Sequence, residues 1–127
     1  MSDRPLTERL LIKKGYSVLF VDEPEGYLRS LEPLPDNVNV AREAEKPVDF
    51  IQVFVTSHRE LEAKLAGAKA RLKPGGLLWV SYPKGTSRIK ADINRDTINT
   101  FAATLGLQGV AMISIDDTWS ALRLKVV

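Results

Sequence analysis

The chain has 127 residues, enough for one domain with a sizeable core, and its 44% hydrophobic and 27% charged residues are ordinary for a globular protein. It contains no cysteine, which excludes disulfides, thiolate metal sites and a cysteine nucleophile. No apolar run approaches the ~20 residues of a membrane span, and the first residues lack the apolar core of a secretory signal. We therefore expect a cytoplasmic protein without a membrane segment.

The net charge of +2 is distributed unevenly along the chain. Residues 22–62 contain ten acidic and four basic residues, a net of −6, whereas residues 64–90 contain seven basic residues and no acidic one. A basic segment raises the question of phosphate or nucleic-acid partners. Four of the seven cations lie on a predicted helix whose outer face must be polar anyway, so we interpret the segment as a solvated face. The acidic segment also argues against nucleic-acid binding.

The first half of the chain predicts short helices between buried strands. Apolar residues at helical spacing predict a helix over 6–14, followed by an apolar strand over 17–22. A short helix is expected from Pro24 to Leu31, because proline suits a first turn. A short strand over 38–41 and a nearly all-apolar strand over 49–55 follow.

The middle of the chain predicts a helix and a second apolar strand. Ser57 and Glu60 have capping-box spacing, which predicts a helix start. Its buried stripe comprises Leu61, Leu65, Ala68 and Leu72. The Pro-Gly-Gly sequence at 74–76 is expected to end this helix, and residues 77–80 form a strand with no polar side chain.

The last third predicts one helix and an antiparallel strand pair. Asn94 is a helix cap, and the buried stripe that follows comprises Ile98, Phe101, Ala102 and Leu105. The strands at 110–115 and 121–127 are separated by too few residues for a parallel crossover. Strands buried on both faces are typical of a parallel sheet between helix layers, so the predicted fold class is a single three-layer α/β domain.

This order of elements resembles the back half of a class I S-adenosylmethionine-dependent methyltransferase. Residues 47–51 (Pro-Val-Asp-Phe-Ile) resemble the start of that family's fourth strand, and residues 72–80 resemble the turn into its fifth. The chain is also similar to a small bacterial family of unknown function through Pro-Glu-Gly-Tyr at 24–27, Trp-Val-Ser-Tyr-Pro-Lys at 79–84 and Asp-x-Thr-Trp-Ser at 116–120. The resemblance implies one Rossmann-like, methyltransferase-like domain over residues 1–127, with strand order 2-1-3-4-6-5 and the sixth strand antiparallel.

The loop after the first strand departs from the methyltransferase pattern. In that family the strand ends in an acidic residue and a glycine-rich turn, which lets the backbone approach the cofactor. Here Phe20 stands at the acidic position and Gly26 is the only matching glycine. We hypothesise that Asp22, Pro24 and Tyr27 fill the space of a nucleoside-type cofactor, and we expect no bound cofactor. If S-adenosylmethionine does bind, the candidate cofactor-binding residues are Asp22, Glu23, Gly26 and Tyr27.

Three loops should meet at the carboxyl ends of the parallel strands, where ligands bind in open α/β sheets: 22–27, 56–58 and 82–88. The third loop holds the candidate anion-binding residues Lys84, Gly85, Thr86, Ser87 and Arg88, which combine two cations with hydroxyls and free backbone donors. A plain solvated loop is the alternative interpretation. The acidic residues of the first loop attract a cation in one interpretation and favour the next helix start in the other.

No catalytic or metal site is predicted. His58, the only histidine, lacks a matching nucleophile and acid and is interpreted as a surface residue. Asp116 and Asp117 are interpreted as turn residues rather than metal ligands. Trp79 and Trp119 are expected in the core, with a pocket or dimer contact as the alternative for Trp119.

The sequence therefore favours a non-catalytic ligand-binding or protein-interaction module, with a small anionic ligand or a protein as partner. A methyltransferase with an atypical cofactor loop is the alternative. The exposed sheet edges also predict a homodimer, because unpaired strand edges can be covered by a second copy.

Overall fold

The computed structural model describes residues 4–41, 46–86 and 91–127, which form one six-stranded sheet and four helices. In chain order the elements are α1 (Leu6–Arg9), β1 (Ser17–Val21), α2 (Tyr27–Ser30), β2 (Asn39–Ala41), β3 (Val48–Phe54), α3 (His58–Ala70), β4 (Leu72–Pro83), α4 (Arg95–Ala103), β5 (Leu107–Ser114) and β6 (Trp119–Val126). None of these helices has the length and apolar character that crossing a bilayer requires.

The strand order is β2-β1-β3-β4-β6-β5, which confirms the predicted topology. The first four strands are parallel, and β6 runs antiparallel to both β4 and β5. From β1 the chain steps outward to β2, whereas β3 lies on the other side of β1. The topological switch point therefore lies between the carboxyl ends of β1 and β3.

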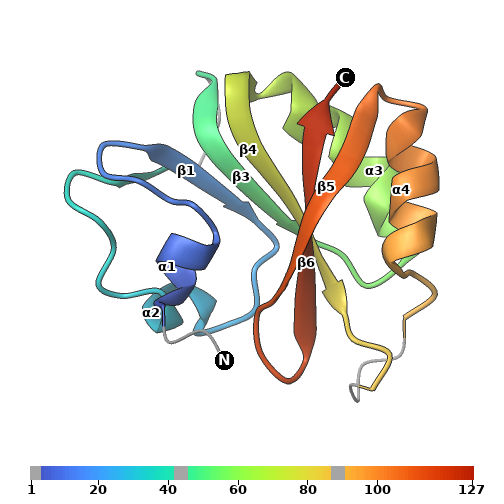
Figure 1. Ribbon diagram of the computed structural model, residues 1–127, viewed down its shortest axis with the longest axis horizontal. Helices are drawn as coiled ribbons and strands as arrows, with labels where there is room; N and C mark the ends of the chain where they lie inside the picture. Colours follow the sequence, from blue (N-terminus) through green and yellow to red (C-terminus); the bar gives the residue numbers. More distant parts are fainter. Residues whose placement is uncertain (1–3, 42–45, 87–90) are drawn as a thin grey trace.

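Each face of the sheet carries its own hydrophobic cluster. In Figure 1, α3 and α4 lie on one side of the sheet and α1 and α2 on the other. The first pair of helices buries Leu61, Leu65 and Ile98 against the sheet, and the second pair, with its flanking segments, buries Leu10 and Tyr27. Burial of strand residues on both faces explains why β1, β3 and the centre of β4 are almost entirely apolar in sequence.

The Pro-Gly-Gly sequence does not lie where the sequence predicted. Helix α3 ends at Ala70, and β4 already begins at Leu72, so residues 74–76 are inside the strand rather than in a turn before it. The pairing of β3 with β4 jumps from Val48↔Leu72 to Phe50↔Leu77. The extra residues form a bulge, and Leu72 contributes to the strand rather than to the helix stripe.

Two short helices are also shorter than predicted. Helix α1 ends at Arg9, because Leu11 turns to a φ of 68° and the carbonyl of Leu10 accepts a hydrogen bond from the indole of Trp79. Helix α2 starts at Tyr27 rather than at Pro24, after Gly26 with a φ of 81°. Both helices are held by contacts with the sheet more than by their own turns.

The two predicted helix caps are confirmed, one of them in part. Ser57 accepts a hydrogen bond from the Glu60 amide, but the Glu60 carboxylate accepts from the Thr56 amide at 2.7 Å instead of completing the box with Ser57. Asn94 accepts from the Thr97 amide, and Thr97 completes a capping box that the sequence did not indicate.

Candidate functional site

The loops after β1 and β3 meet at the switch point and are joined through α3. The carboxylate of Asp22 lies 2.5 Å from Nζ of Lys64, and the same ammonium is 3.9 Å from Glu60 Oε1. The Glu60 carboxylate in turn accepts from the amide and the hydroxyl of Thr56, two residues after the end of β3. Asp22 has a φ of 56° and its side chain is 62% exposed, so this acid is accessible to solvent at the carboxyl end of β1.

Tyr27 lies beneath the loop after β1, inside the core. Its ring is in edge contact with Phe54, at a centroid distance of 4.8 Å, and with Phe20 at 6.0 Å. The hydroxyl donates to Gln52 Oε1 at 2.8 Å, and Gln52 Nε2 donates to Ser81 Oγ at 2.8 Å. Burial raises the pKa of the Tyr27 phenol, so the group stays protonated as a hydrogen-bond donor.

Gln52 and Ser81 are the polar residues of this corner that the sequence analysis missed. Both are fully buried, on β3 and β4 respectively. The available signal was a single amide inside an otherwise apolar strand, because a buried amide needs hydrogen-bond partners. The partners lie 25 and 29 positions away along the chain, so their identity could not be predicted from local sequence.

The loop after β4 contacts the β5–β6 turn through Lys84 and the start of α3 through Asp92, whose carboxylate accepts from the amide of His58 at 2.7 Å. The amide of Lys84 donates to the carbonyl of Thr118 at 2.8 Å, and its ammonium donates to Ser114 Oγ at 2.6 Å. Gly85 and Thr86 are exposed, whereas the candidates Ser87 and Arg88 lie outside the described residues. Lys84 is therefore already engaged with the hairpin, and the five-residue anion site stays a prediction.

Tyr82, just before this loop, is also tied to the hairpin strands. The Tyr82 hydroxyl donates to the sulfur of Met112 at 3.1 Å. Burial raises the pKa of this phenol, with a smaller lowering from Arg95 and a smaller raising from Asp96.

The other residues singled out in the sequence lie on the surface, in a turn or in the core. His58 starts α3, with its side chain 40% exposed and Nε2 3.5 Å from Glu62, which confirms a surface position. Asp116 accepts from the amides of Thr118 and Trp119, as expected of a turn residue. Both tryptophans lie in the core. Within the described residues there is no group of three or more acidic or histidine side chains that could hold a metal.

A comparison with solved structures finds methyltransferases of the same fold. DhpI in complex with SAH is 13% identical, with a TM-score of 0.66, and the match covers 96% of this chain and 82% of that one. A SAM-dependent methyltransferase from Aquifex aeolicus is 18% identical, with a TM-score of 0.64 and coverage of 96% and 88%. The tRNA methyltransferase TrmK of B. subtilis is 13% identical, with a TM-score of 0.58 and coverage of 100% and 67%. At these identities the likeness shows the fold, a class I methyltransferase-like α/β domain.

The family comparison is more specific to this chain. A search of curated proteins gives no significant match. One family model, described as "Protein of unknown function (DUF3052)", matches residues 22–127 and so spans most of the chain, including the loops after β1 and β4. The chain therefore belongs to the DUF3052 family, on a methyltransferase-like fold.

Proposed function

We propose that this protein is a non-catalytic module that binds a small anionic ligand or a protein partner on a methyltransferase-like fold. The observation that supports the proposal is the packing of Tyr27, a residue that is 6% exposed and whose ring packs on Phe54 in the core beneath the loop after β1. A cofactor bound at the switch point needs the backbone of this loop to approach it closely. The Asp22–Lys64 ion pair engages the first residue of this loop, so in this proposal the loop is held in place without a cofactor.

The acids and hydroxyls named above at this corner are engaged in structural contacts, which also supports binding rather than catalysis. A general base needs to lie within hydrogen-bond reach of a nucleophile or of the proton that it removes. In the described part of the corner, Asp22 is paired with Lys64, Glu60 with Thr56, and the Tyr27 hydroxyl with Gln52. Each of these three groups therefore has a structural partner.

The alternative function is a methyltransferase with an atypical cofactor loop. The observation that favours it is the exposed Asp22 carboxylate at the carboxyl end of β1, next to Gly26 with its left-handed backbone. Together with DhpI, which was solved in a complex with SAM as well as with SAH, this makes S-adenosylmethionine the first ligand to test. In this alternative Asp22 leaves Lys64 to contact the cofactor.

Calorimetric titration with S-adenosylmethionine and S-adenosylhomocysteine distinguishes the two functions. The proposal expects no heat of binding in the micromolar range for either compound. The alternative expects micromolar affinity that is lost in Asp22→Asn and retained in Glu62→Gln, which alters an exposed carboxylate on the outer face of α3. Micromolar binding with that mutational pattern would overturn the proposal.

A further inference from the structure

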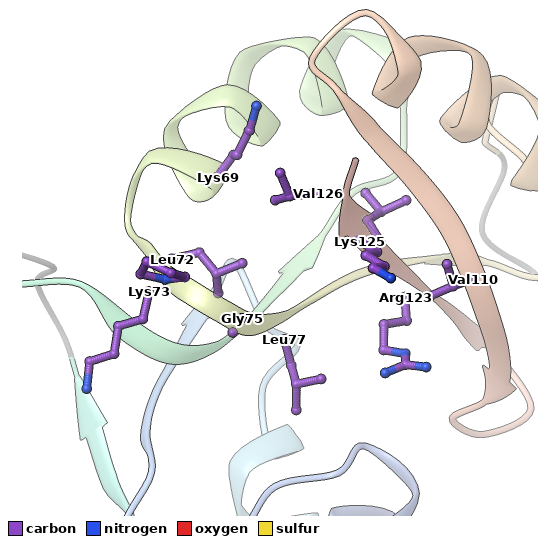
Figure 2. Close-up of a pocket in the computed structure, with 12 residues that line it drawn as sticks. Lys69, Leu72, Lys73, Gly75, Leu77, Val110, Arg123, Lys125 and Val126 are labelled. Carbon is purple, nitrogen blue, oxygen red and sulfur yellow. The ribbon is translucent and has the colours of Figure 1, made fainter.

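A cavity lies at the opposite end of β4 from the switch-point loops. It has a volume of about 790 Å³ and lies between the start of β4, the end of β6 and the bulge of β5 (Figure 2). Leu72 and Pro83 are the two ends of β4, so this cavity and the loop that contains Lys84 are separated by the length of the strand.

Irregular strand pairing opens this cavity on two sides. On β4 the residues between Leu72 and Leu77 bulge away from β3, with a φ of 78° at Gly75. On β5 the pairing with β6 shifts between Gly109 and Ala111, which leaves Val110 out of the ladder. Bulges are features that re-aim backbone and side chains, and here both lie against one cavity.

The charges around the cavity are all positive. Its lining includes Lys69, Lys73, Arg123 and Lys125, and the lining contains no acidic side chain. Two of the cations have partners elsewhere: Lys69 donates to the carbonyl of Leu105, and Lys73 lies 3.4 Å from Asp49. Within the described residues, Arg123 and Lys125 have no acidic or hydrogen-bond partner for their side chains.

The guanidinium of Arg123, unpaired among the described residues, is the main evidence that this cavity is a binding site. Its Nε is buried and has no hydrogen-bond acceptor among the described residues. A buried donor without an acceptor is uncommon in folded proteins, and a guanidinium matches the oxygens of a carboxylate or phosphate with two parallel hydrogen bonds. Residues 123 and 125 are two positions apart on β6, so their side chains project from the same face of the sheet.

Apolar side chains lie beside these cations. Leu77 projects on the same side of the sheet as Arg123 in Figure 2. Val110, 43% exposed, lines the same cavity from β5. A site with two unpaired cations and an apolar wall suits a ligand that combines an anionic head with an apolar body.

We propose that this cavity binds a small amphipathic anion, with its carboxylate or phosphate head on Arg123 and Lys125 and its apolar body against Leu77 and Val110. The proposal goes beyond the function proposed above and does not depend on it, because the two sites lie at opposite ends of β4.

The test measures the binding of octyl phosphate to the full chain. Calorimetry gives the affinity, and NMR shifts of the backbone amides give the location of the site. Inorganic phosphate and 1-octanol are the head-only and body-only probes. We expect octyl phosphate to bind at least about tenfold more tightly than either probe, because only it uses both parts of the site. Amide shifts should concentrate at 72–77, at Val110 and at 123–126, and not at 22–27.

Matched variants test the two cations. Arg123→Gln should weaken octyl phosphate binding at least about tenfold, since a charge-assisted hydrogen bond contributes about 1.5–3 kcal/mol. Lys125→Glu, at an exposed position, should weaken it as well, whereas Lys84→Gln at the other end of β4 should leave it unchanged. Circular dichroism spectra establish that each variant is folded.

Three results would overturn the proposal. One is wild-type affinity in both Arg123→Gln and Lys125→Glu. Another is octyl phosphate binding whose amide shifts lie at 22–27 instead of at the cavity. The third is binding to phosphatidylglycerol vesicles without binding to monomeric octyl phosphate, which would make the basic patch a surface for lipid bilayers. Binding or failure of S-adenosylmethionine at the switch point bears on none of these results.

Discussion

Tyr27 stabilises the corner of the sheet through a single hydroxyl that joins α2 to β3. Replacing Tyr27 with Phe leaves the packing of the ring and removes the donor to Gln52 Oε1, which is fully buried. We expect a loss of about 1–3 kcal/mol in the free energy of unfolding, the cost of an unsatisfied buried acceptor. Urea denaturation measures it.

Tyr16→Phe is the matched control for this change. The Tyr16 side chain is only partly buried, and its hydroxyl has no hydrogen-bond partner among the described residues. Its removal should change stability by no more than about 0.5 kcal/mol. Equal effects of the two substitutions would mean that the bond to Gln52 contributes nothing.

The same phenol makes stability depend on alkaline pH. Burial raises the folded-state pKa of Tyr27 above the ordinary value of 10.0, so the native state holds the proton more tightly than the unfolded chain. This contribution is complete below pH 10.0 and is lost as the pH rises further. The free energy of unfolding should therefore fall between about pH 10 and pH 11.5 in the wild type, and less steeply in Tyr27→Phe.

Urea denaturation at a series of pH values measures this difference. The raised pKa of Tyr82 contributes a similar slope to both proteins, so comparison with the variant isolates Tyr27. Parallel curves for the wild type and Tyr27→Phe would show that the two states bind the Tyr27 proton equally.

At the scale of elements, the bulge of β4 requires glycine at position 76. A Cβ there would lie 2.8 Å from Leu72 Cδ1 and 3.0 Å from the carbonyl of Asp49. Gly76→Ala should destabilise the protein by about 1–3 kcal/mol, because the backbone of β3 cannot move away without breaking the ladder. Thermal or urea unfolding gives the value.

At Gly67, in the middle of α3, the same glycine-to-alanine change should stabilise the protein instead of destabilising it. A Cβ at this exposed position meets nothing within 4 Å. Gly67→Ala should stabilise the protein by about 0.5–1 kcal/mol, because alanine restricts the unfolded chain and favours the helix. If both alanine variants shift stability in the same direction, the steric account of the bulge is wrong.

The elements that the sequence predicted well are those that depend only on residues close together in the chain. The apolar runs of β1 and β3, the antiparallel pair β5–β6 and the caps at Ser57 and Asn94 follow from patterns within a few residues. The strand order also followed, since the resemblance to a known fold supplied the long-range connections.

The predictions that failed depend on neighbours far along the chain. Pro74 and the following glycines read as a turn, but the pairing of Leu72 with Val48 draws them into β4. At the corner, the link from Tyr27 through Gln52 to Ser81 exists only once β3 and β4 lie side by side. The cavity at Arg123 likewise depends on two bulges that no local signal placed together.

Over the whole molecule, the acidic and basic segments of the sequence are brought together by the fold. Lys64 from the basic segment pairs with Asp22, and Lys73 pairs with Asp49, both from the acidic segment. These pairings reduce the positive field that a nucleic-acid interface needs. Arg123 and Lys125, which have no partner in the part of the chain that the structure describes, belong to neither segment, so the charge pattern along the chain did not indicate the cavity that they line.

The sheet also predicts how local stability is distributed. β3 and β4 are each paired on both sides, and β3 is buried over most of its length and β4 over residues 78–83, whereas β2 has three residues and pairs only with β1. Opening β2 exposes little apolar surface, while opening β3 disrupts both hydrophobic clusters. Amide hydrogen exchange followed by NMR should therefore find the slowest amides in β3 and β4 and the fastest strand amides in β2.

The outer edge of β5 extends this prediction to self-association. Its ladder with β6 uses one edge of the strand, so the outward amides should exchange faster than the inward ones in a monomer. Protection of the outward amides that increases with protein concentration would indicate that a second copy pairs with this edge. If the amides of β3 exchanged as fast as those of β2, the predicted order of local stability would be wrong, since β3 contributes to both hydrophobic clusters.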